Sequence, residues 1–311
     1  MSLLYRDGRL LYNDRMLPAG VYAPIPTPFD GAGDIDTTGL HAALVRWLST
    51  PLTGFVVLGS NGEAALLNDC ESDRIVGAAR EAIPAGRPMI VGTGRESTTG
   101  TIAATRRAAE LGADVVIVRT PGFFKAQMTD DVFVRHYRAV ADAAPVPVLL
   151  YNFTAVTGVN LGPAAVEVLA AHPNIVGVKE SGGDVAQIAA FVASASPSFS
   201  VLAGSGTTFY PSLCMGAGGG ILALACVLPT ACVRLFDLTR AGRHDDGRRL
   251  QERLTPLARL LGARLGVAGL KAALRLQGCD VGQPRAPLAP VGPDGVNALR
   301  SALAELGPDI T

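Results

Sequence analysis

The stretch His172-Pro-Asn-Ile-Val-Gly-Val-Lys-Glu-Ser-Gly-Gly-Asp184 combines a short apolar run with one lysine at the end of that run. The run at 175–178 is rich in β-branched side chains and lies between Pro173 and the pair Gly182-Gly183. These bounds predict a buried strand of about 4–6 residues that leads into a loop and then a helix. Lys179 therefore stands at the carboxyl end of a strand.

A charged amine at the end of a buried strand is costly unless it is paired or neutralised. Because desolvation favours the neutral, nucleophilic amine, the position of Lys179 suits a lysine that forms a Schiff base. The alternative is a rim lysine paired with Glu180, and this stretch alone does not decide between the two. The chain has two other lysines, Lys125 and Lys271. Lys271 has helical context, and we expect it at the surface or at an interface.

Seven further apolar segments have the length and composition of short strands. They lie at 20–25, 54–58, 88–91, 114–118, 146–150, 200–203 and 220–223. Stretches with apolar residues at helical spacing separate them. This alternation predicts an α/β protein with a parallel sheet, and eight units predict a closed (β/α)₈ TIM barrel rather than an open doubly wound sheet.

The expected organisation has three parts. They are an N-terminal leader at 1–18, a barrel core at 19–228, and a final barrel helix with a C-terminal helical segment at 229–311. The last part contains four stretches with helical patterns and no strand between them, at 229–243, 245–261, 268–276 and 296–306. We therefore expect a helical extension on the barrel.

The composition describes a globular protein with a large core. Of the 311 residues, 49% are hydrophobic and 17% charged, and the formal net charge is zero. This balance gives no reason to expect nucleic acid or an anionic membrane as a partner. No apolar run reaches the roughly 18 residues of a membrane span, and the N-terminus has no apolar signal core.

The five cysteines are odd in number and form no CxxC pair. Most have apolar neighbours, which favours buried free thiols in a reducing, cytoplasmic environment. The four histidines show no metal-ligand spacing, so we expect no metal site.

Polar residues that follow barrel strands face the catalytic mouth. Here they are Ser60, Asn61, Tyr151, Lys179 and Ser181. Together they fit one reaction: the lysine forms an imine with a 2-oxo acid, hydroxyls and turn amides hold the adjacent carboxylate, and the tyrosine moves a proton. Taken singly, Tyr151 also fits a packing role, and Ser60-Asn61 also fits a plain turn.

Three motifs occur in one order: Gly59-Ser-Asn-Gly-Glu63, Tyr151-Asn152 and Gly177-Val-Lys-Glu-Ser-Gly-Gly183. With them, the chain from about 20 to 288 resembles the pyruvate-dependent class I aldolases that include dihydrodipicolinate synthase and N-acetylneuraminate lyase. Within this family it is most similar to 4-hydroxy-2-oxoglutarate aldolase. The stretches 266–271 and 285–288 add to that likeness.

The resemblance implies roles for individual residues. Lys179 is the Schiff-base lysine, Tyr151 handles the proton, and Ser60 assists in catalysis. The substrate-binding residues implied are Ser60, Asn61, Ser181, Gly204 and the backbone at Ile221. The resemblance also implies a covalent lysine imine with no separate cofactor, a small-molecule 2-oxo acid substrate, and a homotetramer assembled as a dimer of dimers.

The chain departs from the family pattern at several positions. Ala155-Val156 stand where dihydrodipicolinate synthases carry Ser-Arg, and valine cannot form the charge-assisted pair with a second carboxylate. Dihydrodipicolinate synthase activity is therefore not expected, and any distal carboxylate on the substrate is disfavoured. Phe124 replaces a relay tyrosine, and Thr154 replaces a proline. Phenylalanine cannot relay a proton, so Tyr151 must work with Ser60 and water.

These features predict a lyase that cleaves or forms a carbon–carbon bond of a 2-oxo acid, with pyruvate as product or donor. One alternative is a dehydratase or hydratase-aldolase that uses the same imine on a sugar acid or an aryl pyruvate. An alternative of another class is a non-catalytic barrel that binds 2-oxo acids.

Overall fold

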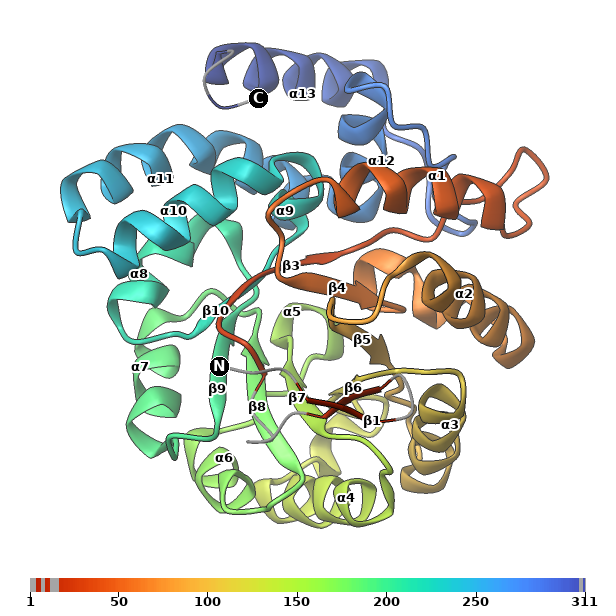
Figure 1. Ribbon diagram of the computed structural model, residues 1–311, viewed down its shortest axis with the longest axis vertical. Helices are drawn as coiled ribbons and strands as arrows, with labels where there is room; N and C mark the ends of the chain where they lie inside the picture. Colours follow the sequence, from red (N-terminus) through yellow and green to blue (C-terminus); the bar gives the residue numbers. More distant parts are fainter. Residues whose placement is uncertain (1–3, 7–8, 12–16, 308–309, 311) are drawn as a thin grey trace.

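The computed structural model describes residues 4–6, 9–11, 17–307 and 310. Eight parallel strands close into a barrel in the order β10-β3-β4-β5-β6-β7-β8-β9 (Figure 1). The strands are Gly20–Pro24 (β3), Gly54–Val57 (β4), Met89–Gly92 (β5), Val115–Arg119 (β6), Val148–Asn152 (β7), Ile175–Glu180 (β8), Ser200–Ala203 (β9) and Gly219–Ile221 (β10). The predicted TIM barrel is confirmed, because each predicted strand segment contains or overlaps one of these strands.

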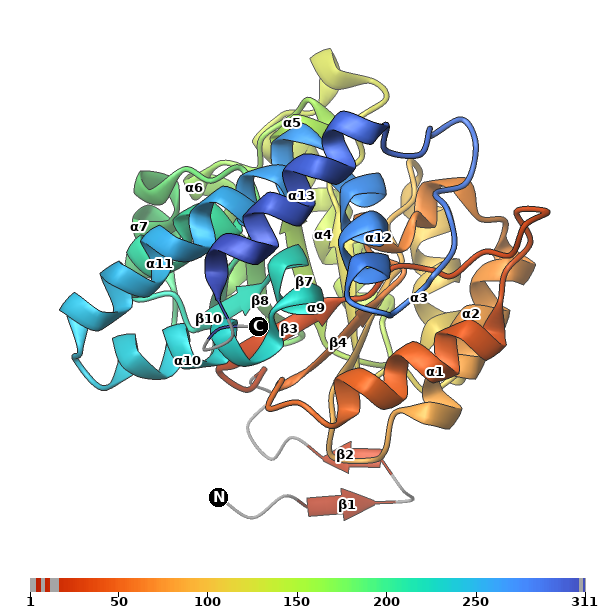
Figure 2. The ribbon, with the colours of Figure 1, turned by 90° about the horizontal axis from the view of Figure 1, so that it is seen from above.

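Helices surround the barrel and extend beyond it on one side (Figures 1 and 2). Those of the ring are Thr37–Leu48 (α1), Asp69–Ala82 (α2), Thr98–Glu110 (α3), Asp130–Ala143 (α4), Pro163–Ala170 (α6), Val185–Ser194 (α7), Phe209–Cys214 (α8) and Pro229–Arg240 (α10). Two short helices, Thr154–Thr157 (α5) and Ala223–Val227 (α9), follow β7 and β10. The C-terminal extension consists of His244–Arg259 (α11), Gly266–Leu276 (α12) and Pro293–Leu306 (α13).

The chain before the barrel contains a small hairpin. Leu4–Arg6 (β1) and Arg9–Leu11 (β2) pair antiparallel in a sheet separate from the barrel (Figure 2). The rest of the predicted leader up to residue 16 lies outside the described residues. Leu17 is buried among side chains of the barrel interior, and the carbonyl of Pro18 accepts a 2.6 Å hydrogen bond from the hydroxyl of Tyr22. The leader thus joins the barrel through its last two residues.

Local sequence signals set several helix starts. Asn68 and Glu71 form a capping box at the start of α2, as their three-residue spacing predicts. The side chains of Asp36, Ser97 and Asp184 accept hydrogen bonds from backbone amides in the first turns of α1, α3 and α7. Each cap contributes about 1 kcal/mol and fixes where a loop at the barrel rim becomes a helix.

The interior of the barrel is filled by apolar side chains from its strands. These are Tyr22, Val56, Ile90, Val115, Ile117, Leu149, Tyr151, Val176, Leu202 and Ile221. Each fully buried aliphatic side chain contributes about 1.5–3 kcal/mol to stability. The barrel is therefore a packed core, with room for a ligand only at its mouth.

Two sequence expectations about buried groups need correction. Lys271 does not lie at the surface: its side chain is 1% exposed, and its Nζ lies 2.7 Å from the Oε1 of Glu63. Burial is tolerated because the ammonium has a carboxylate partner inside the fold. The cysteines are free, but only three of the five are buried; Cys70 and Cys214 are exposed.

Barrel closure depends on a glycine at the seam between β10 and β3, where Gly219 pairs with Gly20. A Cβ on Gly219 would lie 1.9 Å from the carbonyl oxygen of Gly20, so the two backbones would have to separate. We expect Gly219→Ala to lower the free energy of unfolding, measured by urea denaturation, by about 3 kcal/mol. In the control Gly218→Ala, the nearest heavy atom is 3.9 Å away. Equal stability of the two variants would contradict the prediction.

Candidate active site

Lys179 lies in β8 with its side chain 6% exposed, and a β-bulge turns it inward. The register between β7 and β8 shifts so that Val148 pairs with Ile175 but Leu149 pairs with Gly177. Val176 packs in the barrel interior and Val178 in the outer core, so the usual alternation is broken between them. Without this shift, Lys179 would point away from the barrel interior.

Glu180 points to the opposite side of the strand from Lys179. Its Oε2 accepts hydrogen bonds of 2.6 Å from the Nδ2 of Asn152 and 2.8 Å from the Nε2 of Gln187. Burial raises the pKa of Glu180, and these hydrogen bonds oppose that rise. The rim pair between Lys179 and Glu180 is therefore not formed. Among the described residues, no carboxylate makes an ion pair with Lys179.

Tyr151 of β7 is the register partner of Lys179. The Nζ of Lys179 lies 4.2 Å from the centroid of the Tyr151 ring. The Tyr151 hydroxyl is 3.2 Å from the Oγ of Ser60, which comes from the turn after β4. The three residues predicted to be catalytic therefore form one contiguous group at the mouth. An amine, a phenol and a hydroxyl in contact can exchange protons around a bound carbonyl.

The turn after β4 is a single 3₁₀ turn, Ser60–Gly62, with Asn61 half-buried in the middle. Residues on both sides of the turn have left-handed backbones: φ is +56° at Leu58 and +55° at Glu63. A left-handed conformation costs a non-glycine residue about 1–2 kcal/mol, so neighbouring contacts must hold it. Gly92 permits this path, because a Cβ there would lie 1.9 Å from the Leu58 carbonyl oxygen.

The other predicted binding residues are Ser181 directly after β8, Gly204 directly after β9, and Ile221 at the end of β10. The Oγ of Ser181 is buried and has no hydrogen-bond partner within the described part of the chain. It lies against Gly204, where a Cβ would be 1.9 Å from that oxygen. An unpartnered buried hydroxyl costs about 1–3 kcal/mol, so the Oγ of Ser181 is a polar group that the described residues leave unsatisfied. Ile221 is fully buried below, in contact with the interior core.

A cavity of about 550 Å³ opens beside Ser60 and Tyr151. Its other lining side chains include aliphatic groups, Leu66, Val156 and Leu288, and charged groups, Arg95, Glu96 and Arg119. A cavity of about 630 Å³ between α2 and α3 includes none of the predicted site residues. Of the predicted site residues, only Ser60 and Tyr151 line the cavity beside Ser60; those that do not are Lys179, Asn61, Ser181, Gly204 and Ile221. This cavity is therefore the one that adjoins the group of Lys179, Tyr151 and Ser60.

Both arginines in this cavity are paired. Arg119 lies 2.7 Å from Glu96, and Arg95 lies 2.9 Å from Asp69. Burial raises the pKa of Glu96, but hydrogen bonds from the amide of Phe123, the Arg119 guanidinium and the amide of Gly122 outweigh it and lower the pKa. Glu96 therefore stays ionised at neutral pH and neutralises Arg119. Val156, the first of the departures from the family pattern, is 60% exposed at the cavity edge.

Phe124, the second departure, lies on the surface after β6. It is 65% exposed, and its ring packs edge-on against Phe123 at a centroid distance of 5.1 Å. Thr154 begins α5 after β7. The sequence therefore predicted three residues that the structure brings together, Lys179, Tyr151 and Ser60. It missed the buried Glu63–Lys271 pair and the Glu96–Arg119 pair.

Two whole-chain features bear on cofactors and membranes. Over the described ranges, no group of three or more His, Cys, Asp or Glu side chains is arranged to hold a metal ion. The helices described are all too short or too polar to cross a bilayer.

Comparison with known proteins gives consistent results along nearly the whole chain. The model of the dihydrodipicolinate synthetase family matches residues 17–306. A probable mitochondrial 4-hydroxy-2-oxoglutarate aldolase of Emericella nidulans is 36% identical over 299 residues, which is 94% of this chain and 96% of the relative. A 4-hydroxy-tetrahydrodipicolinate synthase of Stenotrophomonas maltophilia is 38% identical over 290 residues, which is 93% of this chain and 97% of the relative. Sequence identity does not separate the two activities.

Solved structures agree with the fold. A chloride-inhibited dihydrodipicolinate synthase from Acinetobacter baumannii, complexed with pyruvate, superposes with a TM-score of 0.89 at 28% identity. It covers 95% of this chain and 100% of the other. A structure described as the first monomeric dihydrodipicolinate synthase variant gives a TM-score of 0.88 at 30% identity, over 92% of this chain and 96% of the other.

Proposed function

The chain belongs to the dihydrodipicolinate synthetase family, as its motifs indicated, and we propose that it is a lyase acting on a 2-oxo acid through an imine on Lys179. Membership makes it an enzyme of the aldolase and lyase type. The observation that carries the finer proposal is the contiguous group of Lys179, Tyr151 and Ser60 at the barrel mouth.

The proposed reaction starts with attack of the Lys179 Nζ on the C2 carbonyl. Tyr151 would donate its proton as the carbinolamine loses water, which leaves an iminium ion and a phenolate. The phenolate would then take the proton of the C4 hydroxyl as the C3–C4 bond breaks, with the electron pair moving into the enamine. Protonation at C3 and hydrolysis of the imine would release pyruvate and free the lysine.

The remaining groups would hold the substrate during these steps. The Ser60 hydroxyl and the turn amides, including that of Asn61, would bind the carboxylate next to the imine. The orphan Oγ of Ser181 would contact the substrate from the other side. The lysine itself is the covalent group, so the reaction as proposed needs no separate cofactor.

The simplest substrate class is a 4-hydroxy-2-oxo acid. The relative from Emericella nidulans is named for one such compound, 4-hydroxy-2-oxoglutarate. In this chain, however, the cavity offers a distal carboxylate only the paired Arg95 and Arg119, beside aliphatic Val156 and Leu288. We therefore infer an aldehyde half without a negative charge. The same environment would admit a dehydratase or hydratase-aldolase that uses the same imine on a sugar acid or an aryl pyruvate.

The charge state of Arg119 gives a test of this inference. Glu96→Gln removes the partner of Arg119, and a charge-assisted hydrogen bond is worth about 1.5–3 kcal/mol. We expect kcat/KM for 4-hydroxy-2-oxoglutarate to rise about tenfold or more relative to that for 4-hydroxy-2-oxopentanoate. The control Glu252→Gln breaks an exposed helix pair with Arg248 and is expected to leave the ratio unchanged. An unchanged ratio in Glu96→Gln would count against Arg119 as a latent carboxylate ligand.

The proposed function is tested by trapping the imine. The protein is incubated with pyruvate and borohydride, and its intact mass is measured. A reduced pyruvyl adduct is the expected result, and folded protein without an adduct would overturn the proposal. Product analysis then separates the alternatives: dehydration leaves the carbon skeleton intact, retro-aldol cleavage splits it, and a non-catalytic binding barrel turns over nothing.

The assembly expected from the sequence also remains a proposal. The exposed rings of Phe123 and Phe124 form an apolar pair beside the mouth, which is consistent with a subunit interface. A tetramer is the expectation, although one structural neighbour is described as monomeric. Analytical ultracentrifugation of the purified chain would measure its oligomeric state directly.

A further inference from the structure

A buried ion pair lies directly below the turn that carries Ser60. The Glu63 carboxylate is fully buried, and its Oε1 lies 2.7 Å from the Nζ of Lys271 in α12, which is 1% exposed. The same Nζ donates a 3.0 Å hydrogen bond to the carbonyl of Gln283 and lies 4.3 Å from the ring centroid of Phe29. Two residues 208 positions apart in the chain are thus joined inside the protein.

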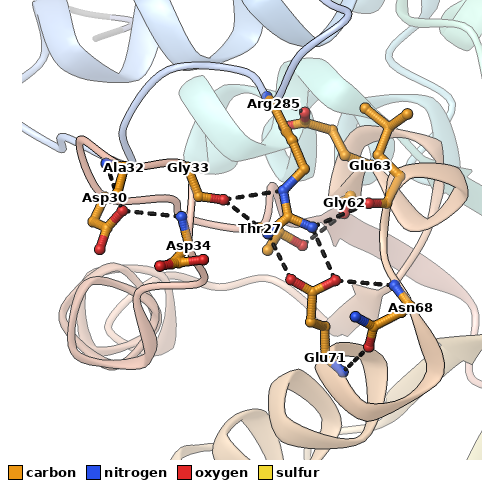
Figure 3. Close-up of polar contacts among 11 residues, drawn as sticks. Thr27, Asp30, Ala32, Gly33, Asp34, Gly62, Glu63, Asn68, Glu71 and Arg285 are labelled. Carbon is orange, nitrogen blue, oxygen red and sulfur yellow. Dashed lines mark hydrogen bonds and ion pairs between the residues drawn. The ribbon is translucent and has the colours of Figure 1, made fainter.

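Glu63 connects the ion pair to the turn, because its side chain belongs to the pair and its backbone to the turn. Its backbone is left-handed, and its N–H donates to the carbonyl of Ser60 at 3.1 Å. The preceding carbonyl, that of Gly62, accepts a 2.6 Å hydrogen bond from the buried hydroxyl of Thr27 (Figure 3). The backbone of the turn is therefore bonded on one side to Glu63 and on the other to Thr27.

Arg285 extends the network to the second carboxylate oxygen. Its backbone N–H donates to the Oε2 of Glu63 at 2.8 Å. Its guanidinium makes five hydrogen bonds: two to the Glu71 carboxylate at 2.6 and 2.9 Å, two to the carbonyl of Gly33, and one to that of Leu66 (Figure 3). All five guanidinium N–H groups can thus be satisfied. Arg285 therefore binds the turn to α2 and to the loop after β3.

The charges in this network suit a rigid support. Burial lowers the pKa of Lys271, while its 2.7 Å contact with the Glu63 carboxylate and the charge of that carboxylate oppose the effect. Buried ion pairs often contribute little net stability, because desolvation of both charges offsets their attraction. What such a pair does provide is a defined geometry, since either charge left alone is strongly disfavoured. Because Glu63 is three residues from Ser60, the fixed geometry of the ion pair can hold the turn in position.

We propose that Glu63, Lys271 and Arg285 are positioning residues that fix the turn 60–62 over the barrel mouth and thereby set the affinity for the substrate carboxylate. The inference rests on the proposed function, because it assumes that this turn holds the carboxylate of a 2-oxo acid. These residues touch the turn and not the reacting atoms. Their loss should therefore weaken substrate binding far more than it slows the chemistry at Lys179.

The test measures the pyruvate concentration that gives half-maximal borohydride-trapped adduct. In Lys271→Met this concentration is expected to rise at least tenfold, while the adduct at saturating pyruvate still reaches the level of the unmodified chain. Glu63→Asp keeps the charge but shortens the side chain by one methylene, so it should raise the half-saturating concentration in the same direction. Glu63→Asp still tests the proposal if Lys271→Met does not fold.

The matched control is Arg80→Met. It breaks an ion pair that is partly rather than fully buried, with Asp114 at 3.1 Å, at the opposite end of the barrel, just before β6. A general loss of stability would affect this variant too, whereas the half-saturating concentration should stay within about twofold of the unmodified chain. Equal values for Lys271→Met, Glu63→Asp and Arg80→Met would overturn the positioning role. An unmodified chain that forms no adduct would instead remove the proposed function, and this inference with it.

Discussion

Replacing Lys179 by alanine is expected to abolish the pyruvate adduct and to lower kcat/KM on the order of 10⁵-fold, the scale on which loss of a covalent nucleophile acts in other enzymes. Within the group of Lys179, Tyr151 and Ser60, the amine of Lys179 is the group that can form an imine, because the other two side chains carry hydroxyls. Removing it also removes the electron sink on which cleavage of the carbon–carbon bond depends. Turnover assays and intact-mass analysis after borohydride treatment measure the two effects separately.

Lys125→Ala is the matched control for this prediction. Lys125 is one of the three lysines of the chain, and it is exposed after β6. Its replacement should leave both the adduct and turnover unchanged. Circular dichroism and urea denaturation establish that both variants are folded. An adduct of equal yield in Lys179→Ala would show that another amine reacts, and the assignment of Lys179 would fail.

Replacing Tyr151 by phenylalanine is expected to lower kcat by about 10²–10³-fold, the usual contribution of a positioned acid–base group. The substitution keeps the ring, so its contact with the Nζ of Lys179 at 4.2 Å and its stacking on Phe153 should persist. Only the hydroxyl that lies 3.2 Å from Ser60 is lost. The adduct should therefore still form at saturating pyruvate, but more slowly. Single-turnover kinetics distinguish this result from a loss of binding.

Tyr137→Phe gives the corresponding control. Its hydroxyl is buried on the outer side of the barrel, where it donates a 3.2 Å hydrogen bond to the carbonyl of Val118. Loss of that bond should cost about 1 kcal/mol of stability without changing kcat. If both variants kept full activity, Tyr151 would have only a packing role, which is the alternative that its position at a strand end also allows.

The barrel could be predicted from the sequence because each strand carries its own signal. Short β-branched runs between turn residues and helical stretches identified eight units, and eight units select a closed barrel. The observed strand boundaries differ from the predicted ones by a few residues, at positions where apolar and polar residues meet. Lys179 lies at the carboxyl end of β8, as predicted, and Tyr151 lies within β7, one residue beyond the predicted strand 146–150.

The direction of the Lys179 side chain could not be read from the sequence. Strict alternation from Val176 would place Lys179 outside the barrel, and only the bulge at Val176–Gly177 reverses it. Such a bulge depends on pairing with a neighbouring strand. The one local trace of it is Gly177, where a Cβ would lie 2.1 Å from the carbonyl oxygen of Ser200.

The buried pair was missed for a related reason. Lys271 has apolar neighbours on both sides in Gly266-Val-Ala-Gly-Leu-Lys-Ala-Ala-Leu274, a pattern that favours burial. A buried lysine nevertheless needs a partner, and Glu63 lies far away in the chain. No periodicity connects the two positions. Only the folded arrangement shows that the charged residue at the end of the Gly59–Glu63 motif is the partner.

The hydrogen bond from the Arg285 backbone to the Glu63 carboxylate has a consequence during synthesis of the chain. The two residues are 222 positions apart, so at about 5–20 residues per second the ribosome adds Arg285 roughly 10–45 s after Glu63. During that interval a nascent chain can already contain Lys179, but not the support for the turn that would bind a substrate. We expect unfinished chains to bind 2-oxo acids more weakly than the complete protein, so that full affinity for the substrate is reached only when synthesis is nearly complete.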